Sequence, residues 1–216
     1  MNEFSIWLGL LDYGNPIAYT LLFTFLLKTI KGKIAKEDAV VLTFGAVMSL
    51  FGGFFIPTGK CIVGLKFHDW IMPSEIVCMV NVGFFIAGTT LIKCLKDRNW
   101  EIKNYVRYFL LVVLMIYLPF FIALINPAFK KVVVANVVGL VGMVCIYIFI
   151  SVESLRRKKV FPMVLVIVSF LLSTALSGIG SKLDLDNALV HWLIEALAVT
   201  CHFCAYIGAR LVYKEK

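Results

Sequence analysis

"NALVHWLIEALAVTCHFCAY", residues 187–206, is a run of 20 residues that is apolar enough to cross a lipid bilayer. A spanning helix needs about 20 mainly apolar residues, because the hydrocarbon core of a bilayer is about 30 Å thick. The run also contains Asn187, His191, Glu195 and His202. Each of these side chains is costly in hydrocarbon unless a partner satisfies it. The stretch therefore predicts a membrane helix with either a working polar site or a polar packing seam.

The composition of the whole chain agrees with a membrane location. Of its 216 residues, 61% are hydrophobic and 16% are charged, whereas a soluble domain has about 45–50% apolar and about 25% charged residues. The net charge of +8 comes from short basic clusters between apolar runs. Such clusters are typical of membrane topology signals, so the basic charge does not indicate nucleic-acid binding.

Seven windows are long and apolar enough to span a bilayer. We therefore expect an all-α integral membrane protein, a bundle of seven transmembrane helices forming a single domain over residues 1–216. The first window is interrupted by "LDYGNP" (residues 11–16), which predicts an irregular end or a kink at Pro16. The windows are residues 5–27, 39–58, 71–92, 105–125, 132–152, 160–180 and 186–209.

The distribution of Lys and Arg predicts the orientation. Of the 21 basic residues, 16 fall in the first, third and fifth loops and the C-terminal tail. Cytoplasmic loops are enriched in Lys and Arg, so we expect the N-terminus outside and the C-terminus in the cytoplasm. A bacterial plasma (inner) membrane and a eukaryotic endomembrane both fit this pattern.

Two of the predicted helices have a face of small residues. Gly45, Ser49 and Gly53 recur every four residues on the second helix, and Ala135 and Gly139 do so on the fifth. Small residues at this spacing allow helix backbones to approach closely in lipid. We interpret both faces as packing seams.

The polar residues of the last helix share one face. Asn187, His191, Glu195 and His202 fall within an arc of about 80° when the helix advances about 100° per residue. A polar stripe of this kind lines a cavity or a seam between helices. His191 and His202 are about 16 Å apart along the axis, so one metal ion cannot bind both.

The sixth predicted helix has a matching polar face. Ser169, Ser173 and Ser177 follow one another at four-residue spacing, and the link to the last helix is short. The two helices should therefore be antiparallel neighbours, which places Ser173 and Ser177 near the depth of His191.

Several other ionisable residues lie towards the outside in this topology. His68 is in the outer loop before the third span, Asp186 is at the outer end of the last span, and Asp12 and Asn15 are at the irregular end of the first span. This set is sufficient for a metal site, in which His191 and His68 would be the zinc ligands, or for a proton-coupled site. An interhelical hydrogen-bond network is the structural alternative.

The seven spans, the chain length and the last helix resemble the superfamily of alkaline ceramidases and progestin/adipoQ receptors. The resemblance implies a zinc site for amide hydrolysis, built from HxxxH on the final helix and an earlier Ser-x3-His. His191 matches the second histidine of the pair, but Asn187 occupies the first position. Ser49 is followed four residues later by Gly53 instead of histidine.

Two classes of function follow. The first is a lipid- or small-molecule-handling protein with an outer polar pocket, either a degenerate hydrolase or a receptor. In the enzyme, His191 would bind a metal or act as general base, Glu195 would orient it, and Ser173 would position water or substrate. The ligand-binding residues would be Asn187, Ser177, Asp186 and His68. The second class is a small transporter or proton-coupled carrier, or a structural membrane subunit. Beyond a ligand, the partners we expect are membrane lipids.

Overall fold

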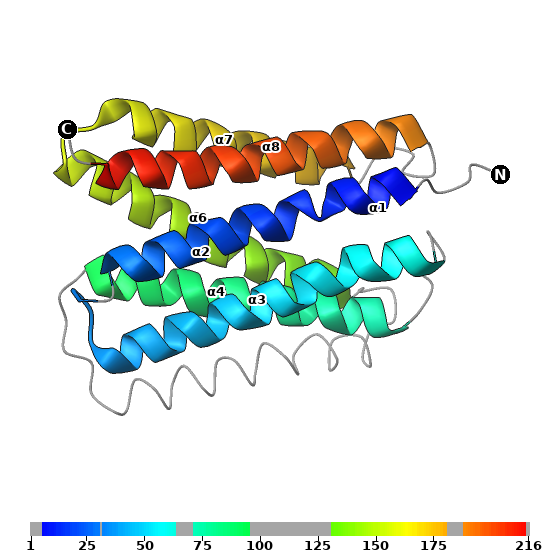
Figure 1. Ribbon diagram of the computed structural model, residues 1–216, viewed down its shortest axis with the longest axis horizontal. Helices are drawn as coiled ribbons and strands as arrows, with labels where there is room; N and C mark the ends of the chain where they lie inside the picture. The colour runs from blue at the N-terminus through cyan, green and yellow to red at the C-terminus, as the bar shows by residue number, and fades with distance from the viewer. Residues whose placement is uncertain (1–5, 31, 64–70, 96–130, 181–187, 215–216) are drawn as a thin grey trace. The chain divides into compact units, whose positions relative to one another are not determined.

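A computed structural model describes residues 6–30, 32–63, 71–95, 131–180 and 188–214. Almost all of these residues are helical, and no strand occurs among them. The helices are α1 (Ile6–Asp12), α2 (Gly14–Ile30), α3 (Lys36–Val63), α4 (Ile71–Leu95), α6 (Lys131–Arg156), α7 (Val160–Gly180) and α8 (Ala188–Tyr213), as Figure 1 shows.

Five stretches of helix are long and apolar enough to cross a membrane. They correspond to five of the windows predicted from the sequence, and α7 occupies the window at 160–180 with an apolar stretch from Val160 to Ser173. The window at 105–125 lies outside the described residues, so the count of seven stays a prediction. The five stretches are Ile6–Ile30, Lys36–Ile62, Ile76–Leu95, Val137–Arg156 and Leu189–Tyr213.

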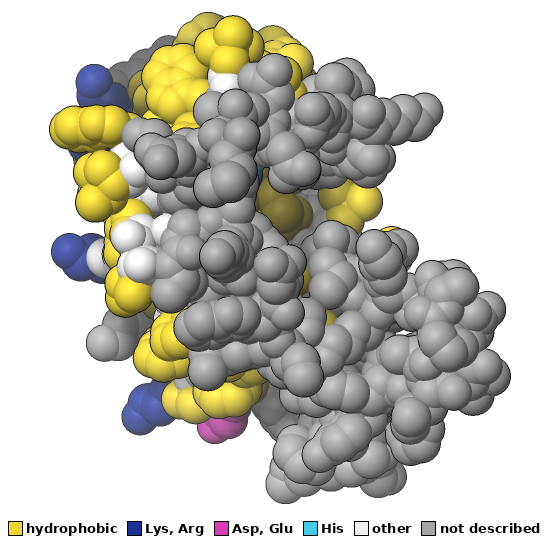
Figure 2. All heavy atoms as spheres, turned by 90° about the vertical axis from the view of Figure 1, so that its right-hand side faces the viewer, with side chains coloured by type: hydrophobic (Ala, Val, Ile, Leu, Met, Phe, Trp, Pro, Cys, Tyr) yellow, Lys and Arg dark blue, Asp and Glu magenta, His cyan; other side chains and the backbone are white. Residues whose placement is uncertain are grey.

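Large apolar side chains are exposed along these helices. Trp7, Phe51 and Phe161 are each about two-thirds exposed, and most of the coloured side chains on the face drawn in Figure 2 are hydrophobic. Extended apolar surface of this kind marks contact with a membrane or a partner. Exposed apolar faces on helices of spanning length are consistent with lipid as the surrounding medium.

The chain divides into two compact units. The first contains residues 1–29, 53–69 and 150–216, and the second contains residues 30–52 and 70–149. α1, α2, α7 and α8 belong to the first unit together with the last part of α3 and the end of α6. The single domain expected over residues 1–216 stays a prediction.

In the second unit, small residues bring α3 and α4 together. A Cβ added at Gly45 would lie 2.8 Å from the carbonyl oxygen of Gly83, and the Ser49 hydroxyl donates to the carbonyl oxygen of Val80 at 3.3 Å. Gly139 on α6 likewise has no space for a side chain beside Asn81 of α4. The packing seams predicted at Gly45, Ser49 and Gly139 are confirmed.

Substitution of Gly142 tests how tightly this unit is packed. A Cβ at Gly142 of α6 would lie 2.4 Å from the carbonyl group of Phe84, which is backbone and cannot rotate away. We expect Gly142→Ala to lower the free energy of unfolding by about 1–3 kcal/mol. Thermal unfolding in detergent measures the effect, with Gly32→Ala as control because nothing lies within 4 Å of that position. Equal stability of both variants would contradict close packing here.

In the first unit, α8 packs against both α1 and α7 (Figure 1). The interruption predicted at "LDYGNP" is a break of one residue at Tyr13, between the end of α1 and the start of α2. The amide of Ile17 donates to the carbonyl oxygen of Tyr13 at 3.1 Å. Pro16 lies in the first turn of α2, where its missing N–H removes no helical hydrogen bond.

The turn from α6 to α7 closes the end of α6 by a Schellman motif. The amide of Lys159 donates to Ser154 O and that of Lys158 donates to Leu155 O, both at 2.9 Å. Lys158 adopts the left-handed conformation that this motif requires, with φ of 54°. The turn places Lys159 beside the end of α8, where its ammonium donates to the carbonyl oxygen of Leu211 at 3.0 Å.

Candidate functional site

A buried ion pair joins α1 to the last part of α3. The Lys60 ammonium lies 2.7 Å from Asp12 Oδ2, and the two residues are 6% and 8% exposed. Lys60 Nζ is also 3.6 Å from Oε1 of Glu195 on α8. One lysine therefore faces two carboxylates that come from different helices.

Asn15, in the first turn of α2, connects these charges to His202, two turns further along α8 than Glu195. Its amide nitrogen donates to Asp12 Oδ1 at 3.0 Å and to Glu195 Oε2 at 3.1 Å. Its amide oxygen lies 2.7 Å from His202 Nδ1. The reverse orientation of the amide would place its oxygen against two carboxylates, so the two carboxylates determine which way Asn15 points.

The two histidines of α8 occupy opposite ends of this network. His191, which is buried, has Nε2 3.6 Å from Glu195 Oε1. His202 donates from Nδ1 to Asn15, because an amide oxygen can only accept, and its ring centroid lies 4.5 Å from that of Tyr19. Their separation along the helix excludes a shared metal ion, as expected, but Glu195 and Asn15 link them into one network.

Two glycines allow the helices to approach closely enough for these contacts. A Cβ at Gly9 would lie 2.5 Å from the sulfur of Cys61, the residue after Lys60. A Cβ at Gly14 would lie 2.6 Å from a methyl group of Val199, which lies on α8 between Glu195 and His202. Glycine at both positions therefore brings α1 to α3, and α2 to α8, at the level of the charges.

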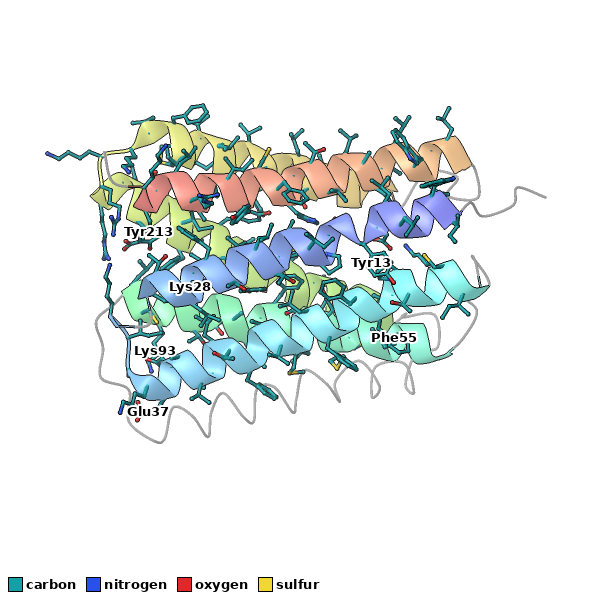
Figure 3. All side chains as sticks on the ribbon, in the orientation of Figure 1. Tyr13, Lys28, Glu37, Phe55, Lys93 and Tyr213 are labelled. Carbon is teal, nitrogen blue, oxygen red and sulfur yellow. The ribbon has the colours of Figure 1, made fainter. Side chains whose placement is uncertain are left out.

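Tyr13 fixes the break between α1 and α2 against α3. Its hydroxyl is hydrogen-bonded to the Thr58 hydroxyl at 2.6 Å, and its ring centroid is 6.3 Å from that of Phe54 (Figure 3). Thr58 is two residues before Lys60, and Tyr13 follows Asp12. The contact thereby holds the backbone next to both members of the ion pair.

The serine face of α7 meets α8 beside the network. The Ser169 hydroxyl donates to the carbonyl oxygen of Cys201 at 2.5 Å, inside the core. Because α7 and α8 are antiparallel neighbours (Figure 1), Ser173 lies one turn further along, near the level of Leu197. Ser173 is thus between the levels of Glu195 and His202, and the backbone of Ser177 is a further turn towards His191.

The other predicted site residues are not placed. Asn187, Asp186 and His68 lie outside the described residues. Within the described ranges, no three His, Cys, Asp or Glu residues are arranged to hold a metal ion. Zinc at His191 and His68 therefore stays a prediction.

Lys60 is the residue that sequence reasoning missed as part of the site. The apolar window predicted for the second span ends at residue 58, which leaves Lys60 in the loop that follows it. α3 instead continues through Pro57 to Val63, and Lys60 is buried. The signal was Asp12: a carboxylate within an apolar segment needs a cation or a hydrogen-bond donor from another helix.

Counted over the described residues, the charges of this network do not balance. Ionised Asp12 and Glu195 contribute two negative charges and Lys60 contributes one positive charge, in surroundings where an unpaired charge is costly. One proton, on His191 or on a carboxylate, would balance the cluster.

Comparison with known proteins adds no family to this description. No protein-family model matches the chain, and neither a curated protein nor a solved structure shows significant similarity to it.

Proposed function

We propose that the chain is an integral membrane protein of seven helices, with its N-terminus outside and its C-terminus in the cytoplasm. It acts as a small carrier that couples proton movement to the movement of a small molecule. The observation that carries this proposal is the buried cluster of Asp12, Lys60, Glu195 and His191. Ionisable side chains inside membrane spans are rare and expensive, and they mark ion and proton pathways.

The charge balance supports proton binding. With His191 neutral, the cluster has one negative charge in excess, and removal of charges from water is costly unless they are compensated. Protonation removes the excess without the entry of another ion. The candidate proton acceptors are Glu195 and His191, whose carboxylate oxygen and ring nitrogen are 3.6 Å apart.

The contacts of Glu195 suggest how a proton changes the structure. Its two oxygens face Lys60 on α3 and Asn15 on α2, at 3.6 Å and 3.1 Å. A proton on Glu195 removes the negative charge that attracts both partners, which weakens the connections of α8 to α2 and α3. A carrier needs such a link, because proton binding must favour one arrangement of the helices over another.

Proton flux in proteoliposomes tests the proposal. We expect wild-type protein, under an imposed pH gradient and a clamped voltage, to carry a proton flux that depends on a transported solute from a panel of small organic molecules. Glu195→Gln should reduce this flux at least tenfold, because glutamine cannot take up the proton.

Glu153→Gln is the matched control for this measurement. Glu153 is a carboxylate of the same unit whose cationic partners are Arg156 and Arg157 at the end of α6. Its amide variant should transport at the wild-type rate. A flux that is the same in the wild type and in Glu195→Gln would contradict the proposal.

The hydrolase or receptor implied by the resemblance has less support. Its zinc site and outer pocket need His68, Asp186 and Asn187, which lie outside the described residues. His191 Nε2 lies 3.6 Å from Glu195 Oε1, and the same oxygen lies 3.6 Å from the Lys60 ammonium. A lysine ammonium so close to Glu195, the neighbour of His191, disfavours a divalent cation at His191.

A further inference from the structure

A cavity of about 340 Å³ lies between α2 and the C-terminal end of α8. Its wall contains aromatic rings from both helices, Phe25 of α2 with Tyr206 and Tyr213 of α8, and two cations, Arg210 and Lys214. Ligand sites in proteins typically enclose about 300–1,000 Å³. The cavity is remote from the buried ion cluster and takes no part in the proposed proton binding.

The two cations of the cavity are available to an anion. Arg210 and Lys214 are exposed, and in the described part of the chain neither forms an ion pair with a carboxylate. The nearby Glu153 instead pairs with Arg156 and Arg157, at 3.1 and 3.8 Å. The Arg210 guanidinium lies 5.9 Å from the centroid of the Tyr206 ring, which helps to orient it over the cavity wall.

Lys159 offsets the partial negative charge at the C-terminal end of α8, which would otherwise repel an anion in the cavity. The C-terminal end of a helix has partial negative charge on its free carbonyl groups. The Lys159 ammonium donates to the carbonyl oxygens of Leu211 and Lys214, so it neutralises this end of α8. The carbonyl groups at the end of α8 therefore do not offset the positive charges of Arg210 and Lys214, which can attract an anionic ligand.

The cavity continues into an exposed apolar surface. Ile207 lines it one turn before Arg210 and is 46% exposed, and Leu21, one turn before Phe25 on α2, is 38% exposed. Tyr213 and Lys28 lie at the same end of these two helices, beyond the apolar residues (Figure 3). Along α2 the side chains thus change from apolar Leu21 to aromatic Phe25 to cationic Lys28, and on α8 Ile207 precedes Arg210 and Lys214. Apolar residues followed by cationic ones match the order of acyl chain and headgroup in a phospholipid.

We propose that this cavity binds a phosphate group through Arg210 and Lys214, as the headgroup of an anionic phospholipid or as a free phosphate ester. Arginine and lysine are the usual phosphate ligands, with arginine able to form two parallel hydrogen bonds. In the proposed topology the cavity faces the cytoplasmic leaflet, where anionic lipids are concentrated.

Thermal unfolding of the purified, delipidated full-length protein with defined additives tests the site. Phosphatidylglycerol added in mixed micelles should raise the melting temperature of the wild type, whereas phosphatidylcholine should not. The same titration with glycerol 3-phosphate distinguishes the sources: a shift with phosphatidylglycerol alone identifies a lipid site, and a shift with both identifies a site for phosphate esters in general. Either shift supports the proposal.

Charge-matched variants decide whether the cavity is the binding site. The variant Arg210→Ala/Lys214→Ala should bind the effective additive at least tenfold more weakly, as read from the concentration that produces half of the shift. The variant Arg156→Ala/Lys158→Ala loses the same charge at the end of α6 and in the turn that follows it, but changes no residue of the cavity wall, and it should bind normally. An absent shift in the wild type, or equal weakening in both double variants, would overturn the proposal.

Discussion

Lys60→Met is expected to lower the free energy of unfolding by about 3–5 kcal/mol, the cost of removing one partner from a buried ion pair. Methionine fills a similar volume, so the loss arises from charge and not from a cavity. Asp12 would lose the ammonium that lies 2.7 Å away, and Glu195 would lose its cation at 3.6 Å. Both carboxylates would remain buried without the Lys60 cation. The midpoint of thermal unfolding in detergent measures the effect.

A second substitution separates this explanation from a general loss of packing. Lys60→Met/Asp12→Leu removes the carboxylate as well, and we expect it to recover more than half of the lost stability, because apolar pairs often replace buried ion pairs at little cost. Lys28→Met makes the same side-chain change at an exposed position near the end of α2 and should be almost neutral. If the double variant were less stable than Lys60→Met, the charge argument would be wrong.

Asp38→Asn is expected to have the second large effect, in the other unit of the chain. Asp38, in the first turn of α3, forms a salt bridge with Lys93 of α4, and the two residues are 6% and 4% exposed. Asparagine keeps the shape but removes the negative charge that Asp38 presents to the buried Lys93 ammonium. Loss of the ion pair should cost about 3–5 kcal/mol of unfolding free energy, measured by thermal unfolding as above.

Glu37 provides a matched control in the preceding position of the same helix turn. Glu37→Gln also converts a carboxylate to its amide and has the same effect on the charge near the helix N-terminus, but Glu37 is exposed. Figure 3 shows Glu37 and Lys93 at one end of this unit. Equal loss of stability in the two variants would assign the effect to the helix terminus and not to the buried pair.

Most of the fold that is described here could be predicted from apolar content alone. Five of the predicted windows coincide with helices of spanning length, because in lipid a segment must satisfy its own backbone hydrogen bonds and a long apolar run can do so only as a helix. The ends of the helices were less predictable. α3 extends to Val63, five residues beyond the expected end, because the buried partner Asp12 makes it possible for Lys60 to lie inside the unit.

The candidate site was predictable in part. Helical periodicity places His191, Glu195 and His202 on one face of α8, and this follows from the spacing of the residues. That Asp12 and Asn15 lie near this face was suggested only by their position towards the outer end of the first span. Periodicity within one helix contains no information about which residue of another helix meets it, so Lys60 was not predicted as the partner of both carboxylates.

The sequence by itself determined that the chain is helical and rich in segments of membrane-spanning length, and that one of these helices has an ionisable stripe. These are properties of single segments, decided by apolar length and by a repeat of 3.6 residues. Only the tertiary structure decided which charges neutralise one another. Gly9 and Gly14 permit close contacts of α1 with α3 and of α2 with α8, and Asn15 then joins Asp12, Glu195 and His202 into one network. Electrostatic attraction is strong only over a few ångströms in a medium of low dielectric constant, so the close approach of the helices determines which residues form the site.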